Sequence, residues 1–241
     1  MNIKTEASKA IVSFFQNALA FETIYQNPEA NYVLHNSSLG QHFFLHIIHD
    51  KTFHKPLSNE HLIVFYLNDQ TLYQQLCDQL IQYGAQQEVA FNPYWNEKGR
   101  SFCIEDVHII LCPTSYQHYR VRIAAPTIDL NKLDNELQVL GLHSFGSFNN
   151  HHQFDGVMLK SQIDIDCHLE FTYFHETKDL IPSDKISLSL ITAEPQSNLI
   201  KQLKIDNHVF ESHFMHEKIE WLQACVNTLF NKSTQVISHD R

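Results

Sequence analysis

The sequence predicts an α+β fold in which a small unit, a strand followed by a helix and about three more strands, is repeated along the chain. Two strand-like segments, residues 42–50 and 168–176, share histidines at their first and eighth places and an acidic residue at the ninth. Each segment is followed by a proline, Pro56 or Pro182, and then by another apolar strand. Internal similarity at such a long spacing is the signature of a repeat architecture.

Hydrophobic periodicity places the remaining elements in order. Apolar runs bounded by polar residues predict strands, and leucines at helical spacing predict helices. The elements expected in the first half are helix 10–21, strands 32–34, 42–50 and 62–67, and helix 72–80. The second half repeats this order with helix 130–142, strands 156–159, 168–176 and 186–191, and helix 199–203.

The repeat divides the chain into two expected domains, residues 1–115 and 116–241. The short polar stretch 113–118 contains a proline and is a natural boundary. The opening strand of the first domain is short, and the last module of the second is expected to be degenerate. Each βαβββ module curls into a sheet with a concave face, so two modules side by side are expected to enclose a pocket.

Composition narrows the classes of partner. The net charge of −10 argues against nonspecific binding to nucleic acid or to anionic membranes. No apolar run approaches the roughly 20 residues of a membrane helix, and the N-terminal residues lack a secretory signal pattern. The five cysteines are scattered and form no CxxC pair, which is typical of reduced thiols. We therefore expect a cytoplasmic protein with no nucleic-acid or membrane partner; a homodimer is compatible with paired modules.

Several segments resemble the vicinal oxygen chelate superfamily, which includes glyoxalases, bleomycin-resistance proteins and extradiol dioxygenases. The similar segments are Y-R-V-R-I-A-A-P-T at 119–127, F-D-G-V-M at 154–158, H-L-E-F at 168–171 and an aromatic turn, N-P-Y-W, at 92–95. The resemblance implies a glyoxalase-like fold of four βαβββ modules arranged as two tandem copies. It also implies further strands at 1–5, 102–106, 107–112, 119–127 and near 227–230. It implies little about activity, because this fold hosts many unrelated functions.

The resemblance also implies where a metal would bind. In catalytic members of the superfamily, His or Glu from the first and fourth strands of each module holds a divalent ion. Transferred to this chain, one pocket keeps His61, with Ile110 at its carboxylate position, and the other keeps Glu170. Arg120 and His118 lie near the remaining first-strand position of that second pocket. A divalent ion needs three or four converging ligands. No cofactor is therefore favoured; if a divalent metal does bind, its candidate ligands are His61, His118 and Glu170.

Glu170 is the strongest candidate for a polar group inside a pocket. An acid in an apolar strand has a perturbed environment if it points inward, and such residues are common at functional sites. The alternative is a structural pair with Arg120 or Arg122 across the sheet, and the two roles are compatible. His168 lies two residues earlier and so shares the strand face of Glu170.

Two aromatic residues and two cysteines complete the candidates. Tyr94 and Trp95 either cap the first pocket, stacking on a flat ligand, or pack a wide turn. Cys103 and Cys112 are interpreted as core thiols, because the sequence places no obvious base beside them.

These observations favour a small-molecule-binding protein of the glyoxalase and bleomycin-resistance type with a metal-free, apolar pocket. The pocket candidates are Glu170, His168, Arg120, His61, Tyr94 and Trp95. One alternative is a divalent-metal-dependent lyase or dioxygenase of the same superfamily, in which the metal would chelate vicinal substrate oxygens. Another is a non-catalytic interaction protein. Whether the protein is an enzyme is left open.

Overall fold

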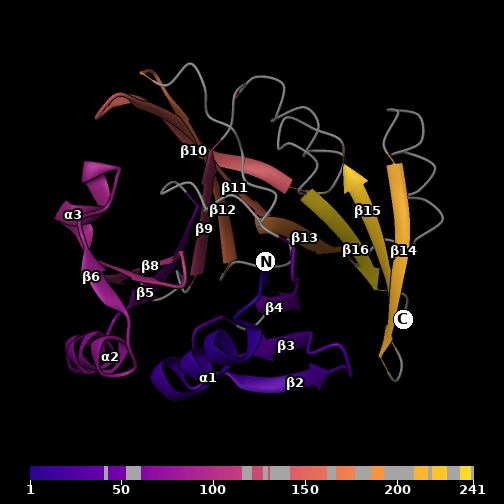
Figure 1. Cartoon of the computed structure of the whole chain (residues 1–241). Helices are drawn as coiled ribbons and strands as arrows, with labels where there is room; N and C mark the ends of the chain where they lie inside the picture. The colour runs from indigo at the N-terminus through magenta and orange to yellow at the C-terminus, as the bar shows by residue number, and fades with distance from the viewer. Residues whose placement is uncertain are drawn as a thin grey trace.

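The structure is a computed structural model that describes residues 1–40, 43–52, 61–115, 121–126, 130, 142–161, 167–176, 186–192, 209–216, 219–226 and 234–239. Its strands form two eight-stranded mixed sheets, each built from two four-stranded modules (Figure 1). No helix within the described ranges has the length and apolar character needed to cross a membrane.

The first sheet joins the two ends of the chain. Its strand order is β14-β15-β16-β13-β1-β4-β3-β2, and the opening strands β1 and β13 pair antiparallel. Module one consists of β1 (Asn2–Thr5), α1 (Ser8–Leu19), β2 (Glu22–Gln26), β3 (Tyr32–His35) and β4 (Phe44–His49). Module four contains β13 (Ile186–Thr192), β14 (Val209–His216), β15 (Ile219–Val226) and β16 (Thr234–His239).

The second sheet is formed by the middle of the chain. Its strand order is β10-β11-β12-β9-β5-β8-β7-β6, and the opening strands β5 and β9 again pair antiparallel. Module two consists of β5 (Leu62–Leu67), α2 (Gln70–Gln82), β6 (Gln86–Glu88), α3 (Pro93–Lys98), β7 (Arg100–Ile104) and β8 (Val107–Pro113). Module three contains β9 (Val121–Pro126), β10 (Leu142–His151), β11 (Phe154–Ser161) and β12 (Cys167–Phe174).

The fourfold repeat predicted from the sequence is confirmed. In every module the opening strand lies parallel to the fourth strand, and the third and second strands follow outward. The modules do not pair within each half of the chain. Module one pairs with module four, and module two pairs with module three. Strand β9 follows β8 after a short connection and runs back beside β5, as consecutive elements commonly do. Each sheet therefore combines one module from each half of the chain.

Three local expectations need correction. The N-P-Y-W segment is not a turn but the start of helix α3: the Asn92 side chain accepts a hydrogen bond from the Tyr94 N–H at 3.0 Å, and Pro93 occupies the first helical position. The strand expected at 102–106 ends at Ile104, because Glu105 and Asp106 form a two-residue turn in which both have positive φ, the geometry that suits a tight hairpin. The last strand lies at 234–239 rather than near 227–230. Residues 131–141 and 199–203, where helices were expected, lie outside the described residues apart from helical Leu130.

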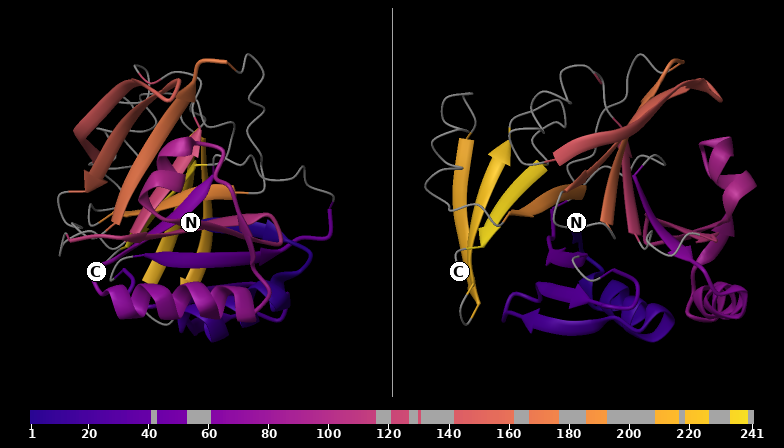
Figure 2. Two further views of the ribbon diagram at one scale, coloured as in Figure 1. Left: turned by 90° about the vertical axis from the view of Figure 1, so that its left-hand side faces the viewer. Right: turned by 180° about the vertical axis from the view of Figure 1, so that it is seen from behind.

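The two sheets share one hydrophobic core. Helices α1 and α2 lie side by side at the bottom of the views (Figure 2). Phe21 of module one contacts Phe43 and also Phe65 of module two, with ring centres 6.3 and 6.2 Å apart. A second apolar cluster covers the other face of the second sheet and includes Leu62, Val64, Tyr66, Trp95, Ile110 and Ala124. We call this face the inner face of the second sheet, and it carries the candidate site.

Candidate functional site

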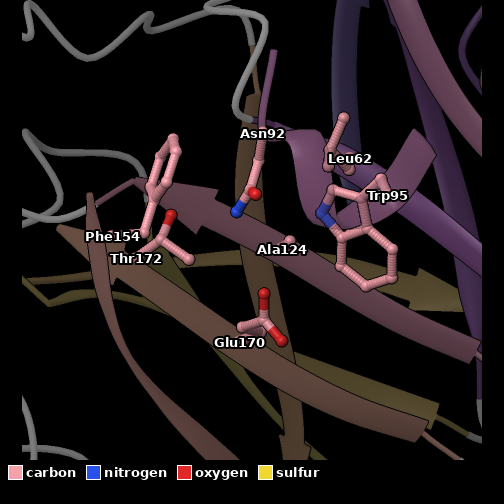
Figure 3. Close-up of a pocket in the computed structure, with 7 residues that line it drawn as sticks. All are labelled: Leu62, Asn92, Trp95, Ala124, Phe154, Glu170 and Thr172. Carbon is pink, nitrogen blue, oxygen red and sulfur yellow. The ribbon is translucent and has the colours of Figure 1, made fainter. Parts of the chain in front are cut away.

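A small cavity lies on the inner face of the second sheet, where modules two and three meet (Figure 3). Both modules line it: β5, β9, β11 and β12 contribute to its walls, together with helix α3 and its capping residue. The lining residues are Leu62, Asn92, Trp95, Ala124, Phe154, Glu170 and Thr172. The centre of a water molecule can occupy about 10 Å³ of this space, which is room for roughly one water. In this conformation the site is therefore nearly closed.

Sheet register explains why these residues meet. Leu62 pairs with Ala124, and Ala124 pairs with Glu170, so all three point to the same face. Arg122 lies two residues before Ala124 and is therefore a diagonal neighbour of Glu170 on the same face. Thr172 follows Glu170 by two residues and extends the row toward Phe154. The antiparallel pairing of the opening strands thus creates the site.

A buried ion pair forms the polar centre of the site. Arg122 Nη1 donates a hydrogen bond to Glu170 Oε2 at 2.5 Å, and the two residues are only 9% and 2% exposed. The guanidinium carbon lies 5.4 Å from the ring centre of Tyr66 and 5.9 Å from that of Trp95. Both rings are close enough for cation–π attraction, which helps to replace the lost hydration of the guanidinium.

Burial and pairing act in opposite directions on the carboxyl group. Burial raises the pKa of Glu170 above its ordinary value, and the Arg122 guanidinium opposes this shift. Burial, the largest effect, would lower the pKa of Arg122, but the Glu170 carboxylate together with nearby Tyr66 and Tyr94 outweighs it, so the pKa of Arg122 is raised. The arginine therefore stays charged, and the carboxyl group has one oxygen bound to it and the other directed toward the cavity (Figure 3).

Hydrogen-bonding groups and aromatic surfaces surround this free oxygen. In Figure 3 the hydroxyl of Thr172, the amide of Asn92 and the nitrogen-bearing edge of the Trp95 indole are turned toward the cavity. Phe154 forms the remaining aromatic wall and stacks on Phe174 with ring centres 4.6 Å apart. The cavity thus offers one carboxylate oxygen among several possible donors and two flat apolar surfaces.

Aromatic contacts between the two modules lie beside the cavity. Phe91, just before α3, meets Phe154 and Phe174 edge-on at 5.9 and 5.1 Å. Tyr94 lies 5.5 Å from the ring of His151 in the β10–β11 hairpin. Tyr94 thus belongs to the rim, whereas its neighbour Trp95 lines the cavity. Of the predicted pocket residues, the structure brings Glu170 and Trp95 together at the cavity.

The two predicted histidines lie near the site without lining it. His168 is buried and packs against Phe145 with ring centres 4.6 Å apart. His61 is buried just before β5, and burial, followed by the effect of nearby His108, lowers its pKa to about 4. His61 and Glu170, predicted to belong to different pockets, lie on the same sheet because module two pairs with module three.

Two predicted residues, Arg120 and His118, lie outside the described residues. The arginine that pairs with Glu170 is Arg122, one of the two alternatives that the sequence left open. Thr172 and Ala124 were not predicted. The signal for them was available in the two-residue spacing along β9 and β12, but it becomes useful only once the partner strand is known.

The residues at this cavity do not fit a divalent cation. Glu170 is the only carboxylate among the lining residues, and a guanidinium already binds it. Leu62, Ala124 and Phe154 offer no ligand atom, whereas a divalent site needs three or four converging ligands. Among the described side chains, three could hold a metal together, but they lie elsewhere on the sheet: Glu88, Cys103 and His108.

Family comparisons agree with the module order. Residues 60–111 match the model of the YycE-like C-terminal domain, and residues 121–172 match that of the YycE-like N-terminal domain. A C-terminal unit that precedes an N-terminal unit is the order expected where one tandem copy ends and the next begins. The two matched units are modules two and three, which together form the second sheet.

Comparison with solved structures covers almost the whole chain. Glyoxalase I from Zea mays is similar with a TM-score of 0.71 and 10% identity, over 99% of this chain and 90% of that one. A putative dioxygenase from Bacillus subtilis subsp. subtilis str. 168 has a TM-score of 0.64 and 10% identity, over 100% of this chain and 84% of that one. At this identity the likeness shows the fold alone. No curated protein matches the sequence. Modules two and three thus match YycE-like domains, and the chain as a whole has the glyoxalase-like fold, built from tandem copies of paired modules.

Proposed function

We propose that this protein binds a small organic molecule beside Glu170, in a pocket where the Arg122 guanidinium stands in the place of a metal ion. The observation that carries the proposal is the buried Arg122–Glu170 ion pair, whose second carboxylate oxygen is directed toward the cavity. Removing two charges from water costs several kcal/mol per ion before pairing offsets it. This desolvation cost favours a ligand-binding role for the buried ion pair over a purely structural one.

The lining indicates the chemistry of the ligand. The free oxygen of Glu170 accepts a hydrogen bond, so the ligand should carry a donor such as a hydroxyl or an amine. Trp95 and Phe154 present flat apolar surfaces on which an aromatic or other planar group can stack. Because Arg122 neutralises Glu170, the cavity has no strong net charge, and a neutral or singly charged molecule suits it best.

Ligand entry requires a change in shape. The cavity holds about one water molecule, so a larger ligand must displace a lining side chain. Trp95 belongs to the short helix α3, whose contacts with module three include aromatic pairs, such as Tyr94 with His151. In this proposal the ligand takes the place of the indole, and α3 moves outward by breaking those edge contacts.

The metal-dependent lyase or dioxygenase of the superfamily is the less supported alternative at this cavity. Its chemistry needs a divalent ion that binds substrate oxygens, and a guanidinium at 2.5 Å from the only lining carboxylate would repel such an ion. In the proposed site, the positive charge next to Glu170 is therefore the Arg122 guanidinium and not a metal ion.

Tryptophan fluorescence tests the proposal directly. The chain has two tryptophans, so a Trp221→Phe background leaves Trp95 as the only reporter. Untagged protein is titrated with a panel of phenols, small aromatic amines and vicinal dicarbonyls. We expect at least one class to change the Trp95 emission saturably, with the same affinity in the presence of EDTA. Glu170→Gln should weaken that binding by about tenfold or more, since a hydrogen bond to a charged group is worth about 1.5–3 kcal/mol.

A matched variant controls for the loss of charge. Glu29 is an exposed carboxylate between β2 and β3 of module one, and Glu29→Gln should leave the affinity unchanged. Binding that EDTA abolishes would return the metal-dependent alternative to first place. Binding that Glu170→Gln leaves intact would place the ligand elsewhere on the protein.

A further inference from the structure

A second group of polar side chains lies on the inner face of the second sheet, at its β6–β7–β8 edge. Glu88, Cys103 and His108 each offer a ligand atom, and these atoms all lie within 4.8 Å of one another. His108 Nδ1 is 2.5 Å from Glu88 Oε1. We propose that these three residues form a binding site for a divalent transition-metal ion of the zinc type, separate from the Glu170 cavity.

Strand register brings the three side chains to one face. Cys103 of β7 pairs directly with His108 of β8, because the two-residue turn between the strands fixes their alignment. On the other side of β7, Cys103 pairs with Gln86, which places Glu88 diagonally beside it. The His108 ring and the Glu88 carboxylate meet over Cys103, so the thiol lies next to both.

The ligand set suits zinc. Thiolate, imidazole and carboxylate are its usual protein ligands, and three of them leave a fourth position for water or another molecule. Tetrahedral zinc with ligand bonds of about 2.0–2.3 Å keeps its ligand atoms roughly 3.3–3.6 Å apart. The present atoms need shifts of only about an ångström to reach that spacing. The Glu88 side chain is 31% exposed and can make the adjustment.

Access and rigidity also fit an ion site. The His108 side chain is only 8% exposed and is held in the centre of the sheet, whereas Glu88 reaches the solvent. An ion can therefore enter from the side of Glu88 and meet an already positioned imidazole. Before the ion arrives, the hydrogen bond between His108 and Glu88 holds these two ligands together, and the ion replaces the proton that they share.

This site differs from the one implied by the superfamily resemblance. That site draws on first and fourth strands of two modules, whereas Glu88, Cys103 and His108 come from the second, third and fourth strands of module two alone. Three strand spacings separate β8 from β12, which places His108 about 14 Å from Glu170. The two sites can therefore be tested independently.

Cobalt(II) is the appropriate probe, because its spectrum reports both thiolate ligation and tetrahedral geometry. Untagged full-length protein is freed of metal with a chelator, which is then removed, and titrated with Co²⁺. We expect one equivalent to give a thiolate-to-cobalt charge-transfer band in the near ultraviolet, and Zn²⁺ to displace it. Cys103→Ser should abolish the band. Cys167→Ser, which alters another half-buried strand thiol, should retain it.

Further variants separate ligation from folding. Glu88→Gln keeps an acceptor for His108 but loses the ligand charge, and we expect it to weaken Zn²⁺ binding at least tenfold with an unchanged circular dichroism spectrum. Glu170→Gln should leave Zn²⁺ affinity unchanged. The proposal is overturned if Co²⁺ binds without a thiolate band, as it would on scattered surface histidines of this His-rich chain. It is also overturned if the band survives in Cys103→Ser, or if folded Glu88→Gln binds Zn²⁺ as tightly as the parent.

Discussion

Two carboxylates on the inner face of the same sheet have opposite surroundings. Glu170 is fully enclosed, and a guanidinium from the neighbouring strand neutralises it permanently. Glu88 lies at the sheet edge, partly exposed, beside an imidazole and a thiol that can both give up a proton. The fixed guanidinium beside Glu170 excludes a metal ion. The protons of the imidazole and the thiol beside Glu88 can instead be displaced by a metal ion. This difference is the physical basis on which we propose a metal-free pocket at Glu170 and a metal site at Glu88, a few strands apart on one sheet.

The pairs made by Glu170 and Glu88 are also expected to contribute differently to the free energy of unfolding. A buried ion pair loses hydration on both sides, so each partner depends strongly on the other. A pair with a partly exposed member is worth little, because water replaces the lost contact. Glu170 and Glu88 should therefore respond very differently when a partner is changed.

The largest expected effect follows from removing the cation beside Glu170. Arg122→Met leaves the carboxylate buried without its partner, and we expect the free energy of unfolding to fall by about 3–5 kcal/mol. Urea denaturation measures this loss. Arg100→Met is the control, since Arg100 is a less buried arginine that stacks on Tyr73, and its loss should be clearly smaller.

A double variant distinguishes charge from shape. Arg122→Met combined with Glu170→Leu replaces the whole pair by apolar side chains, and exchanges of that kind are often neutral or stabilising. We expect most of the lost stability to return. If the double variant is as unstable as Arg122→Met alone, the arginine matters for packing against Tyr66 and Trp95 rather than for neutralising Glu170.

His46 in the first sheet contrasts with Arg122, because burial disfavours its charged form. Burial, and then the nearby Met1 ammonium group, lower the pKa of His46 to about 4. Between about pH 6.5 and pH 4 the unfolded chain binds a proton that the folded chain rejects, so the stability falls as the pH falls through this range. His46→Gln should reduce the loss of stability between pH 7 and pH 5 by about 1–2 kcal/mol.

Denaturation at both pH values, with His143→Gln as an exposed control, measures the His46 effect. An unchanged pH dependence in His46→Gln would mean that the ring is protonated in the folded protein.

The sequence predicts the elements and the repeat well because both depend on local patterns. Strand 62–67 follows from apolar periodicity, the repeat follows from the similar segments 42–50 and 168–176, and the four modules follow from the family resemblance. The pairing of modules could not be predicted, since the fully buried opening strands β5 and β9 would suit either arrangement. The cytoplasmic location and a homodimer stay predictions.

The site was predicted in part for the same reason. Glu170 and Trp95 were found because an acid in an apolar strand and an aromatic motif are visible in the sequence. Cys103 was read as a thiol without a base, although His108 lies directly opposite it. The available signal was the length of the hairpin: a two-residue turn at Glu105 and Asp106 fixes which residues face each other.

The smallest expected effect concerns the carboxylate at the sheet edge. In metal-free protein, Glu88→Gln should change the free energy of unfolding by less than about 1 kcal/mol, because the side chain is partly exposed and its amide oxygen still accepts a hydrogen bond. Added Zn²⁺ should raise the melting temperature of the parent protein and raise that of Glu88→Gln much less, since an ion that binds only the folded state stabilises it in proportion to its affinity. Glu97→Gln, which alters an exposed carboxylate 3.3 Å from His152, should respond to Zn²⁺ like the parent. If metal-free Glu88→Gln instead lost as much stability as Arg122→Met, the two carboxylates would be equivalent parts of the core, and exposure would not be what distinguishes them.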